Sequence, residues 1–401
     1  MKPFRQIHMT RFLKFSAFAA GALALLSAMW IVVPAPYPAI WLFSVAASEW
    51  SLWIAALALF AVVCALTAGY YGDGGKVWIL SLIIGIVALI ISIYPLLSVV
   101  SIARENNVSL SLKRYFSRVF PNVVQPENFK SYTFAQIDGV DLQLDVHAPT
   151  AETANNGASV IVVHGGSWSG GRRGDFSQWN QWLAANGYTV FDVDYRLTQP
   201  NYLTAAGDVK CAIRWVKNHA AEFKIAPEKI ALLGRSAGAH LALLAAYSAD
   251  DARIPANCVE NQSGESVRAV VSFYAPIDLL WAFDNPANER VINGKTTLAN
   301  FLGGSPHESH EMRERYLLTS PLSHISADTP PTLLIHGGQD QLVRSINMVF
   351  LDEKLTSANV PHQTLFIPYA QHGFDYNFNG FGAQIVQPET LKFLSENIES
   401  R

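Results

Sequence analysis

Apolar positions dominate the first quarter of the chain, where long stretches contain no charged residue. Between residues 15 and 103, only Glu49 and the short segment 73–76 carry charge. A membrane-spanning helix needs about 20 consecutive apolar residues to cross a hydrocarbon core of about 30 Å. The uncharged stretches therefore predict a transmembrane anchor, residues 1–103, with three helices at about 15–33, 50–69 and 77–101.

Aromatic, basic and proline residues near the ends of these stretches bear on the prediction of membrane-spanning helices. Tyr and Trp side chains lie there, as is typical of a membrane interface. The basic tail up to Lys14, followed by an apolar run, also resembles a signal peptide. Pro34, Pro36 and Pro38 make a poor cleavage region, and the run is long for a signal peptide. A retained first helix is therefore favoured over a cleaved one.

Residues 104–130 are predicted to be a linker between the anchor and the rest of the chain. The segment 110–120 mixes bulky apolar side chains with Lys113, Arg114 and Arg118. A basic amphipathic stretch of this kind can lie on lipid headgroups. A linker, or a first helix packed on the following domain, fits the same segment equally well, so these alternatives stay open.

The pattern changes over residues 131–401, where short apolar runs alternate with amphipathic segments. Two runs around Asp138 and Gly139 predict a β-hairpin. Further strands are predicted at 159–163, 189–194, 229–233, 269–273, 332–336 and 364–367. Helices are predicted at 178–186, 204–223, from 237 onward, at 344–356 and at 388–398. This alternation indicates an α/β domain with a mainly parallel sheet and helices on both faces, interrupted at 279–322 by a small cap.

A Gly-x-Ser-x-Gly motif at 234–238 is the strongest chemical signal. It follows an apolar strand and opens a run compatible with a helix. A serine on such a tight strand-to-helix turn is exposed as a nucleophile, while the flanking glycines let strand and helix approach each other. The motif alone is weak, but in this setting it predicts that Ser236 is a catalytic nucleophile.

A second motif, His-Gly-Gly-Ser-Trp at 164–168, directly follows the predicted strand 159–163. Attack on an ester carbonyl creates an oxyanion, which preorganised N–H donors must stabilise. The donors expected here are the backbone N–H groups of Gly165, Gly166 and Ala237. Ser167 and Trp168 are candidates for contact with the substrate, although core packing explains Trp168 equally well.

A serine nucleophile needs a base and a carboxylate that orients it. His372 follows the last predicted strand, and Asp340 follows the strand before it. Side chains of an active site lie beyond the carboxyl ends of the strands in open α/β sheets. The resulting order of Ser236, Asp340 and His372 along the chain is the order found in α/β-hydrolases, so we expect these residues to form a catalytic triad.

With these motifs, residues 131–398 resemble the esterase/lipase branch of α/β-hydrolases. That branch includes hormone-sensitive-lipase-like carboxylesterases, acetyl esterases and kynurenine formamidase. Besides the two motifs above, the resemblance rests on segments that begin at Asp194, Asp208 and His336. Ser167 and Ala239 depart from it, because the family often has glycine there. The resemblance implies hydrolysis of an ester, with short acyl chains preferred, and does not extend to residues 1–120.

Composition narrows the functions further. A net charge of −3 gives no electrostatic basis for binding nucleic acid. Three cysteines without Cys-x-x-Cys or Cys/His spacing indicate neither a disulfide framework nor a zinc site. We therefore expect no metal and no cofactor, and as partners only a small-molecule or lipid ester substrate and the lipid bilayer.

Three other functions fit parts of the pattern. An amidase or formamidase would use the same triad. A hydrolase fold without activity would serve as a binding module, although an intact triad argues against it. A transport or sensing unit would need polar groups within its helices, and the predicted helices carry no charge.

Charge also predicts the orientation of this multi-pass chain. Short basic segments stay on the cytoplasmic side, and the N-terminal tail is basic whereas the loop 34–49 has no Lys or Arg. Three crossings then place the catalytic domain on the non-cytoplasmic face. Four basic residues after the third helix oppose this orientation: Arg104, Lys113, Arg114 and Arg118. Outside the cytoplasm, Cys211 and Cys258 would be able to pair.

Overall fold

The computed structural model describes residues 4–71, 75–117, 129–149, 155–258, 263–399. Contacts divide the chain into two compact units. The first contains residues 1–119 and 367–385, and the second contains residues 120–366 and 386–401. Arg118 and the end of the predicted amphipathic segment lie outside the described residues.

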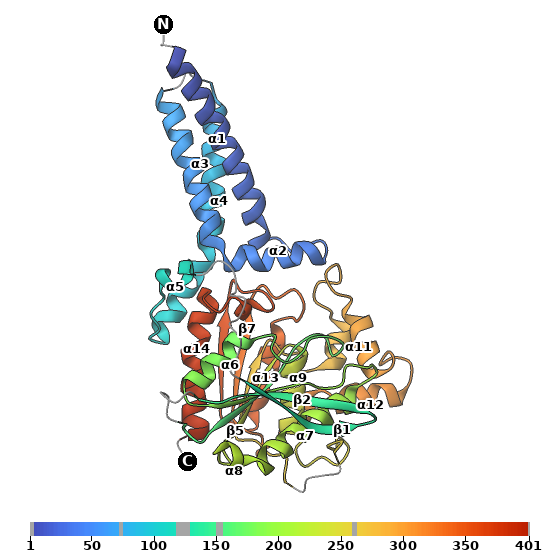
Figure 1. The fold of residues 1–401 in the computed structure, drawn as a ribbon. Coiled ribbons are helices and arrows are strands. Elements are labelled where there is room, and N and C mark those ends of the chain that lie inside the picture. The colour runs from blue at the N-terminus through green and yellow to red at the C-terminus, as the bar shows by residue number, and fades with distance from the viewer. Residues whose placement is uncertain (1–3, 72–74, 118–128, 150–154, 259–262, 400–401) are drawn as a thin grey trace. The chain divides into compact units, whose positions relative to one another are not determined.

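In the first unit, three long helices pack side by side (Figure 1). The helices of its N-terminal part are α1 Phe4–Ala28, α2 Pro38–Glu49, α3 Ser51–Tyr71, α4 Val77–Glu105 and α5 Leu112–Ser117. Small residues line the contacts of the bundle, where Ala24, Ala58 and Ala88 are fully buried. A Cβ added at Gly85 would lie 2.9 Å from the Val62 side chain. Small residues let helix backbones approach closely, as in membrane bundles.

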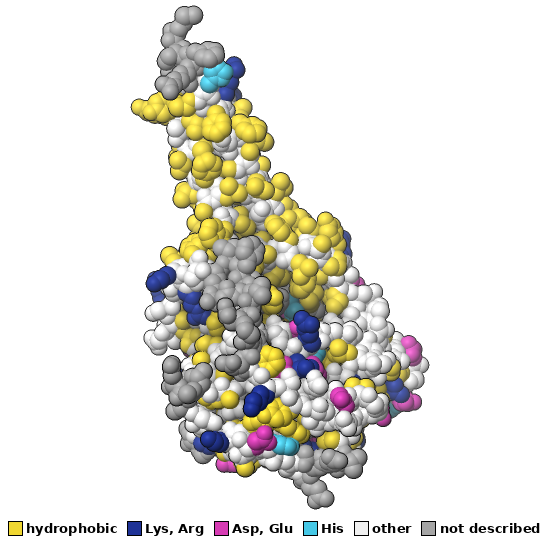
Figure 2. All heavy atoms as spheres, in the orientation of Figure 1, with side chains coloured by type: hydrophobic (Ala, Val, Ile, Leu, Met, Phe, Trp, Pro, Cys, Tyr) yellow, Lys and Arg dark blue, Asp and Glu magenta, His cyan; other side chains and the backbone are white. Residues whose placement is uncertain are grey.

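Large apolar side chains cover the outside of this bundle, as Figure 2 shows. The helical stretches 8–31, 51–71 and 77–105 are long and apolar enough to cross a membrane. The structure also contains α2, where the sequence predicts only a loop. Pro38 occupies its first turn, where a missing N–H costs nothing.

The second unit is built on an eight-stranded sheet with the order β1-β2-β4-β3-β5-β6-β7-β8. The strands are β1 Lys130–Ile137, β2 Val140–His147, β3 Ser159–Val163, β4 Thr189–Val193, β5 Ile230–Arg235, β6 Ala269–Phe273, β7 Thr332–Gly337 and β8 His362–Ile367. β2 pairs antiparallel with β1 and β4, whereas β4, β3, β5, β6 and β7 are parallel neighbours. The predicted hairpin and mainly parallel sheet are therefore confirmed.

Helices α6, α7, α9 and α13 pack against this sheet. The helices that follow α5 are α6 Ser177–Ala185, α7 Tyr202–Asn218, α8 Ala220–Phe223, α9 Ala237–Tyr247, α10 Leu279–Asp284, α11 Gly294–Leu302, α12 His310–Leu318, α13 Ile346–Ser357 and α14 Phe381–Leu394. Three of them, α10, α11 and α12, occupy the segment in which the cap is predicted. The α/β class predicted from the alternation of strands and helices is confirmed.

The last helix differs from the prediction. The sequence places its start at Pro388, but α14 begins at Phe381 and contains Pro388 in its interior. Proline disfavours the interior of a helix because it lacks an N–H. Phe381, Ile385 and Val386 are nonetheless buried, so packing outweighs the local preference.

Cys211 of α7 forms a disulfide with Cys258, with their Cα atoms 5.7 Å apart. The pairing considered from the sequence is thus present. Cys64 of α3 is a buried free thiol.

Candidate active site

Ser236 lies on the turn between β5 and α9, in the strand-to-helix setting predicted for it. Its backbone has φ 54° and ψ −122°, a region that side chains other than glycine rarely adopt. Such strain is typical of a nucleophile elbow. A Cβ at Gly238 would overlap the carbonyl oxygens of Val163 and His164, so glycine is required there for α9 to approach the end of β3.

The loop after β3 packs directly against this turn. A Cβ added at Gly165 would lie 3.3 Å from Cβ of Ser236 and 3.0 Å from the carbonyl oxygen of Arg235. Gly166 has φ +118°, which only glycine adopts easily. The structure therefore brings the backbone of the expected oxyanion loop to Ser236, and Ala237 begins α9 beside it.

Ser167 and Trp168 continue the loop with φ 53° and 58°. Left-handed backbone favours glycine, which accounts for the glycine that the resembled family often has at position 167. Ser167 and Trp168 therefore adopt this backbone at some cost in strain.

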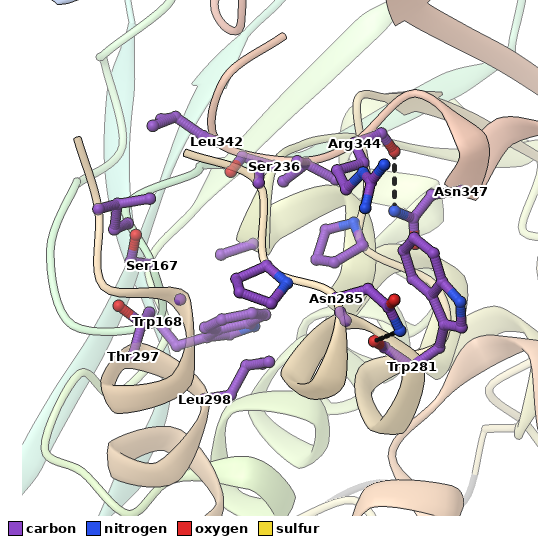
Figure 3. Close-up of a pocket in the computed structure, with 18 residues that line it drawn as sticks. Ser167, Trp168, Ser236, Trp281, Asn285, Thr297, Leu298, Leu342, Arg344 and Asn347 are labelled. Atoms are coloured by element: carbon purple, nitrogen blue, oxygen red, sulfur yellow. Dashed lines mark hydrogen bonds between the residues drawn. The ribbon is translucent and has the colours of Figure 1, made fainter. Parts of the chain in front are cut away.

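Ser236, Ser167 and Trp168 line a pocket in the second unit (Figure 3). Side chains of the cap line it, from α10, from α11 and from the segment between them. Another wall consists of residues that come after β7 in the chain. Labelled members of these walls in Figure 3 are Trp281, Asn285, Thr297, Leu298, Leu342, Arg344 and Asn347. The guanidinium of Arg344 stacks on Trp281 with 5.6 Å between its Cζ and the ring centre.

Trp168 is a fixed wall of this pocket. Its ring stacks on Phe301 at 4.4 Å between ring centres, and its indole N–H donates to Nδ1 of His240 over 3.2 Å. Nε2 of His240 lies 2.8 Å from the carbonyl oxygen of Thr319. Burial lowers the pKa of His240 to about 4, so the ring is neutral and holds Trp168. His240 is thus a packed structural residue.

Asp340 follows β7 and is fully buried. Its Oδ1 accepts the backbone N–H groups of Leu342 at 2.8 Å and Val343 at 2.9 Å, while Oδ2 lies 3.3 Å from Nε2 of His336. Hydrogen bonds from backbone N–H groups favour the charged form of a carboxylate. The loop therefore fixes Asp340 in one orientation, beyond the carboxyl end of its strand.

His372 lies five residues beyond β8, the edge strand next to β7. Its side chain is buried, and it belongs to the segment 367–385 of the first unit. Sequence order thus places Ser236, Asp340 and His372 after β5, β7 and β8, as the α/β-hydrolase pattern requires.

Other carboxylates of the second unit have structural partners. Asp278 caps α10 by accepting the N–H of Trp281 at 2.9 Å. Arg196 binds Asp208 through its guanidinium at 2.8 to 3.2 Å.

The pocket walls Trp281, Asn285 and Arg344 are absent from the sequence-based predictions. One indication for Arg344 was present in the sequence, because Arg344 follows β7, the same strand that Asp340 follows. Trp281 and Asn285 carried none, because only the fold of the cap brings them to Ser236.

The chain is similar to known proteins in sequence and in fold. The BD-FAE family model matches residues 144–355. "Probable carboxylic ester hydrolase LipM" of Mycobacterium tuberculosis is 31% identical over 57% of this chain and 52% of its own length. The acetylxylan esterase of Xylanibacter ruminicola is 25% identical over 63% and 48%. The chain spans about half the length of the curated relatives it matches.

Solved structures share the fold. Butyrate-bound esterase 2 of Thermogutta terrifontis aligns with a TM-score of 0.54 and 25% identity over 67% of this chain and 94% of its own. A truncated carbohydrate esterase from gut microbiota aligns with a TM-score of 0.56 and 21% identity over 69% and 99%. Because the family model covers more than half of the chain and the fold agrees with it, this chain belongs to the BD-FAE family and its second unit is of the α/β-hydrolase type.

Proposed function

We propose that the chain is a membrane-anchored serine carboxylesterase. The observation that carries this proposal is the strained turn at Ser236, which lies against the Gly165 backbone and opens into a pocket. A nucleophile, an oxyanion loop and a substrate cavity then meet at one point. Relatives named carboxylic ester hydrolase and esterase support the same chemistry.

The proposed mechanism is acyl transfer to water. Ser236 attacks the carbonyl carbon while His372 takes its proton, and Asp340 holds His372 in the right tautomer and stabilises the imidazolium. The N–H groups of Gly165, Gly166 and Ala237 stabilise the oxyanion. His372 then protonates the leaving alcohol and activates the water that hydrolyses the acyl-enzyme.

The enzyme is expected to prefer esters with short acyl chains, from two carbons (acetyl) to four (butyryl). Trp168 and Leu298 confine the pocket, and the solved esterase with bound butyrate and the acetylxylan esterase are related proteins. The measurement is kcat/KM for p-nitrophenyl esters from two to sixteen acyl carbons, with anilides of the same acids in parallel. A clear optimum at long acyl chains would contradict the preference, and faster cleavage of the anilides would assign the site to an amidase.

A matched variant separates pocket size from general damage. Leu298→Ala enlarges the pocket without altering Ser236 or its loop. It is expected to shift the optimum toward longer chains while activity on the acetyl ester changes little.

We further propose that the three apolar helices cross the membrane and place the catalytic unit on the non-cytoplasmic face. The basic tail supports this orientation, and so does the Cys211–Cys258 disulfide, because disulfides persist mainly in oxidising compartments.

Protease added to intact spheroplasts is expected to digest the catalytic unit. A cytoplasmic marker protein in the same sample serves as the control and should survive. If the catalytic unit survives until the membrane is opened, the proposed orientation is wrong.

A further inference from the structure

The segment that carries His372 folds together with the N-terminal helices. Residues 367–385 belong to the same compact unit as α1 to α5. Two parts of the helical region contact this segment: the end of α2 just before α3, and α5 just after α4. Each contact lies next to a stretch apolar enough to cross a membrane.

Glu49 makes the first contact. It is the last residue of α2, and its side chain is only 2% exposed. The Asn377 side chain donates a hydrogen bond to its carbonyl oxygen at 3.3 Å. A Cβ added at Gly380 would overlap Oε2 of Glu49, so the carboxyl group lies directly on the backbone of the segment.

Polar groups from both sides of His372 face this carboxyl group. They are the hydroxyl of Tyr369, the amide of Asn377 and the carboxylate of Asp375. Burial raises the pKa of Glu49 well above its usual range, Tyr369 and Asn377 oppose the rise, and Asp375 adds to it. Burial therefore favours the protonated carboxyl group, which like an amide has one donor and one acceptor side.

Tyr369 extends the contact into α14. Its hydroxyl accepts the backbone N–H of Gly382 at 2.9 Å. Tyr369 is 1% exposed, so it joins the chain just before His372 to the start of that helix.

Helix α5 makes the second contact. Tyr115 stacks on Phe381, with 4.4 Å between ring centres and 14° between planes. Arg114 donates to the carbonyl oxygen of Phe378 at 2.9 Å and to Oδ1 of Asn379 at 3.1 Å. The segment that carries His372 is thus contacted by residues from two of the N-terminal helices, α2 and α5.

We propose that Glu49 is a positioning residue for His372, so that the anchor takes part in assembling the active site besides holding it at the membrane. This inference rests on the proposed role of His372 as the base. Tyr369 lies three residues before His372 and Asn377 five residues after it, and the buried side chain of Glu49 packs against this segment at Gly380. Loss of that side chain removes the packing that holds the loop, and a displacement of about 1 Å at a catalytic group can cost about 100-fold in rate.

The test uses the full chain in detergent or vesicles. Glu49→Ala is expected to lower kcat by about 10- to 100-fold with KM nearly unchanged, because the described pocket walls come from other segments. Rates are divided by the number of active sites that a fluorophosphonate labels to completion, so loss of folded protein does not count. Glu49→Gln, which keeps one donor and one acceptor, is expected to restore most of the turnover number.

Ser48→Ala is the matched control. Ser48 is buried in the same turn of α2, but its hydroxyl donates to the carbonyl oxygen of Ser44 within that helix. Its turnover number should equal that of the parent chain. If Glu49→Ala does not fold, Tyr369→Phe removes the hydroxyl that acts on Glu49 and accepts the N–H of Gly382, and it should lower kcat by about 10-fold.

The outcomes separate this inference from the proposed function. If His372→Ala keeps its activity, the proposed triad itself is wrong. If His372→Ala is inactive but Glu49→Ala or Tyr369→Phe keeps its kcat, the positioning role alone is overturned. Equal loss in Glu49→Gln and Glu49→Ala would also overturn it.

Discussion

Ser236→Ala is expected to lower the turnover number for ester hydrolysis by a factor on the order of 10⁶, as loss of the nucleophile does in other serine hydrolases. The alanine has no oxygen to attack the carbonyl carbon. Ser236 sits at φ 54° before α9, and alanine meets the same backbone strain there, so the fold should persist. Turnover and circular dichroism of the purified full chain measure both effects.

Ser248→Ala is a suitable control for this variant. Ser248 lies at the other end of α9, where its buried hydroxyl donates to the carbonyl oxygen of Leu244. The substitution is the same and the helix is the same, but the pocket is untouched. If Ser236→Ala kept more than a few per cent of activity, the nucleophile would be another residue.

Asp340→Asn is expected to lower kcat by about 10⁴-fold with little change in KM. Oδ1 of Asp340 is held by the N–H groups of Leu342 and Val343, and asparagine can accept both bonds. The second oxygen becomes an amide, which cannot accept the Nδ1–H of the histidine base. The base is then held in the wrong tautomer, and the imidazolium loses its counter-charge.

Asp278→Asn makes the same chemical change away from the proposed triad. Asparagine caps a helix as well as aspartate does, so α10 and the turnover number should be unaffected. An unchanged kcat in Asp340→Asn would move the orienting role to another carboxylate, and Asp375, three residues after His372, would be the first to examine.

The sequence predicted the elements whose burial is uniform. All five residues of β3 and of β6 are buried, and central parallel strands of this kind read as continuous apolar runs. The strand-to-helix turn at Ser236 was predictable because Gly234, Ser236 and Gly238 lie within five residues, so its geometry depends on the local sequence.

Elements held by distant contacts were not predictable. α2 follows a proline-rich segment that reads as a loop, and α14 starts seven residues before the proline expected to begin it. In both, packing outweighs local preference.

Glu49 shows the same limit at the level of single residues. It stands as a single carboxylate among apolar residues, which marks it in the sequence as unusual. Its neighbours Asn377 and Gly380 are more than 300 positions away, and no periodicity reveals such a contact. The nucleophile Ser236 could be predicted because its motif lies within one turn of the chain. The residue proposed to position the catalytic histidine, Glu49, could not.

Labelling of the intact full chain with a fluorophosphonate, followed by mass spectrometry of the peptides, tests the central claim most directly. We expect one adduct, on Ser236, formed in step with the loss of ester hydrolysis. An adduct on another residue, or full loss of activity with Ser236 unmodified, would contradict it.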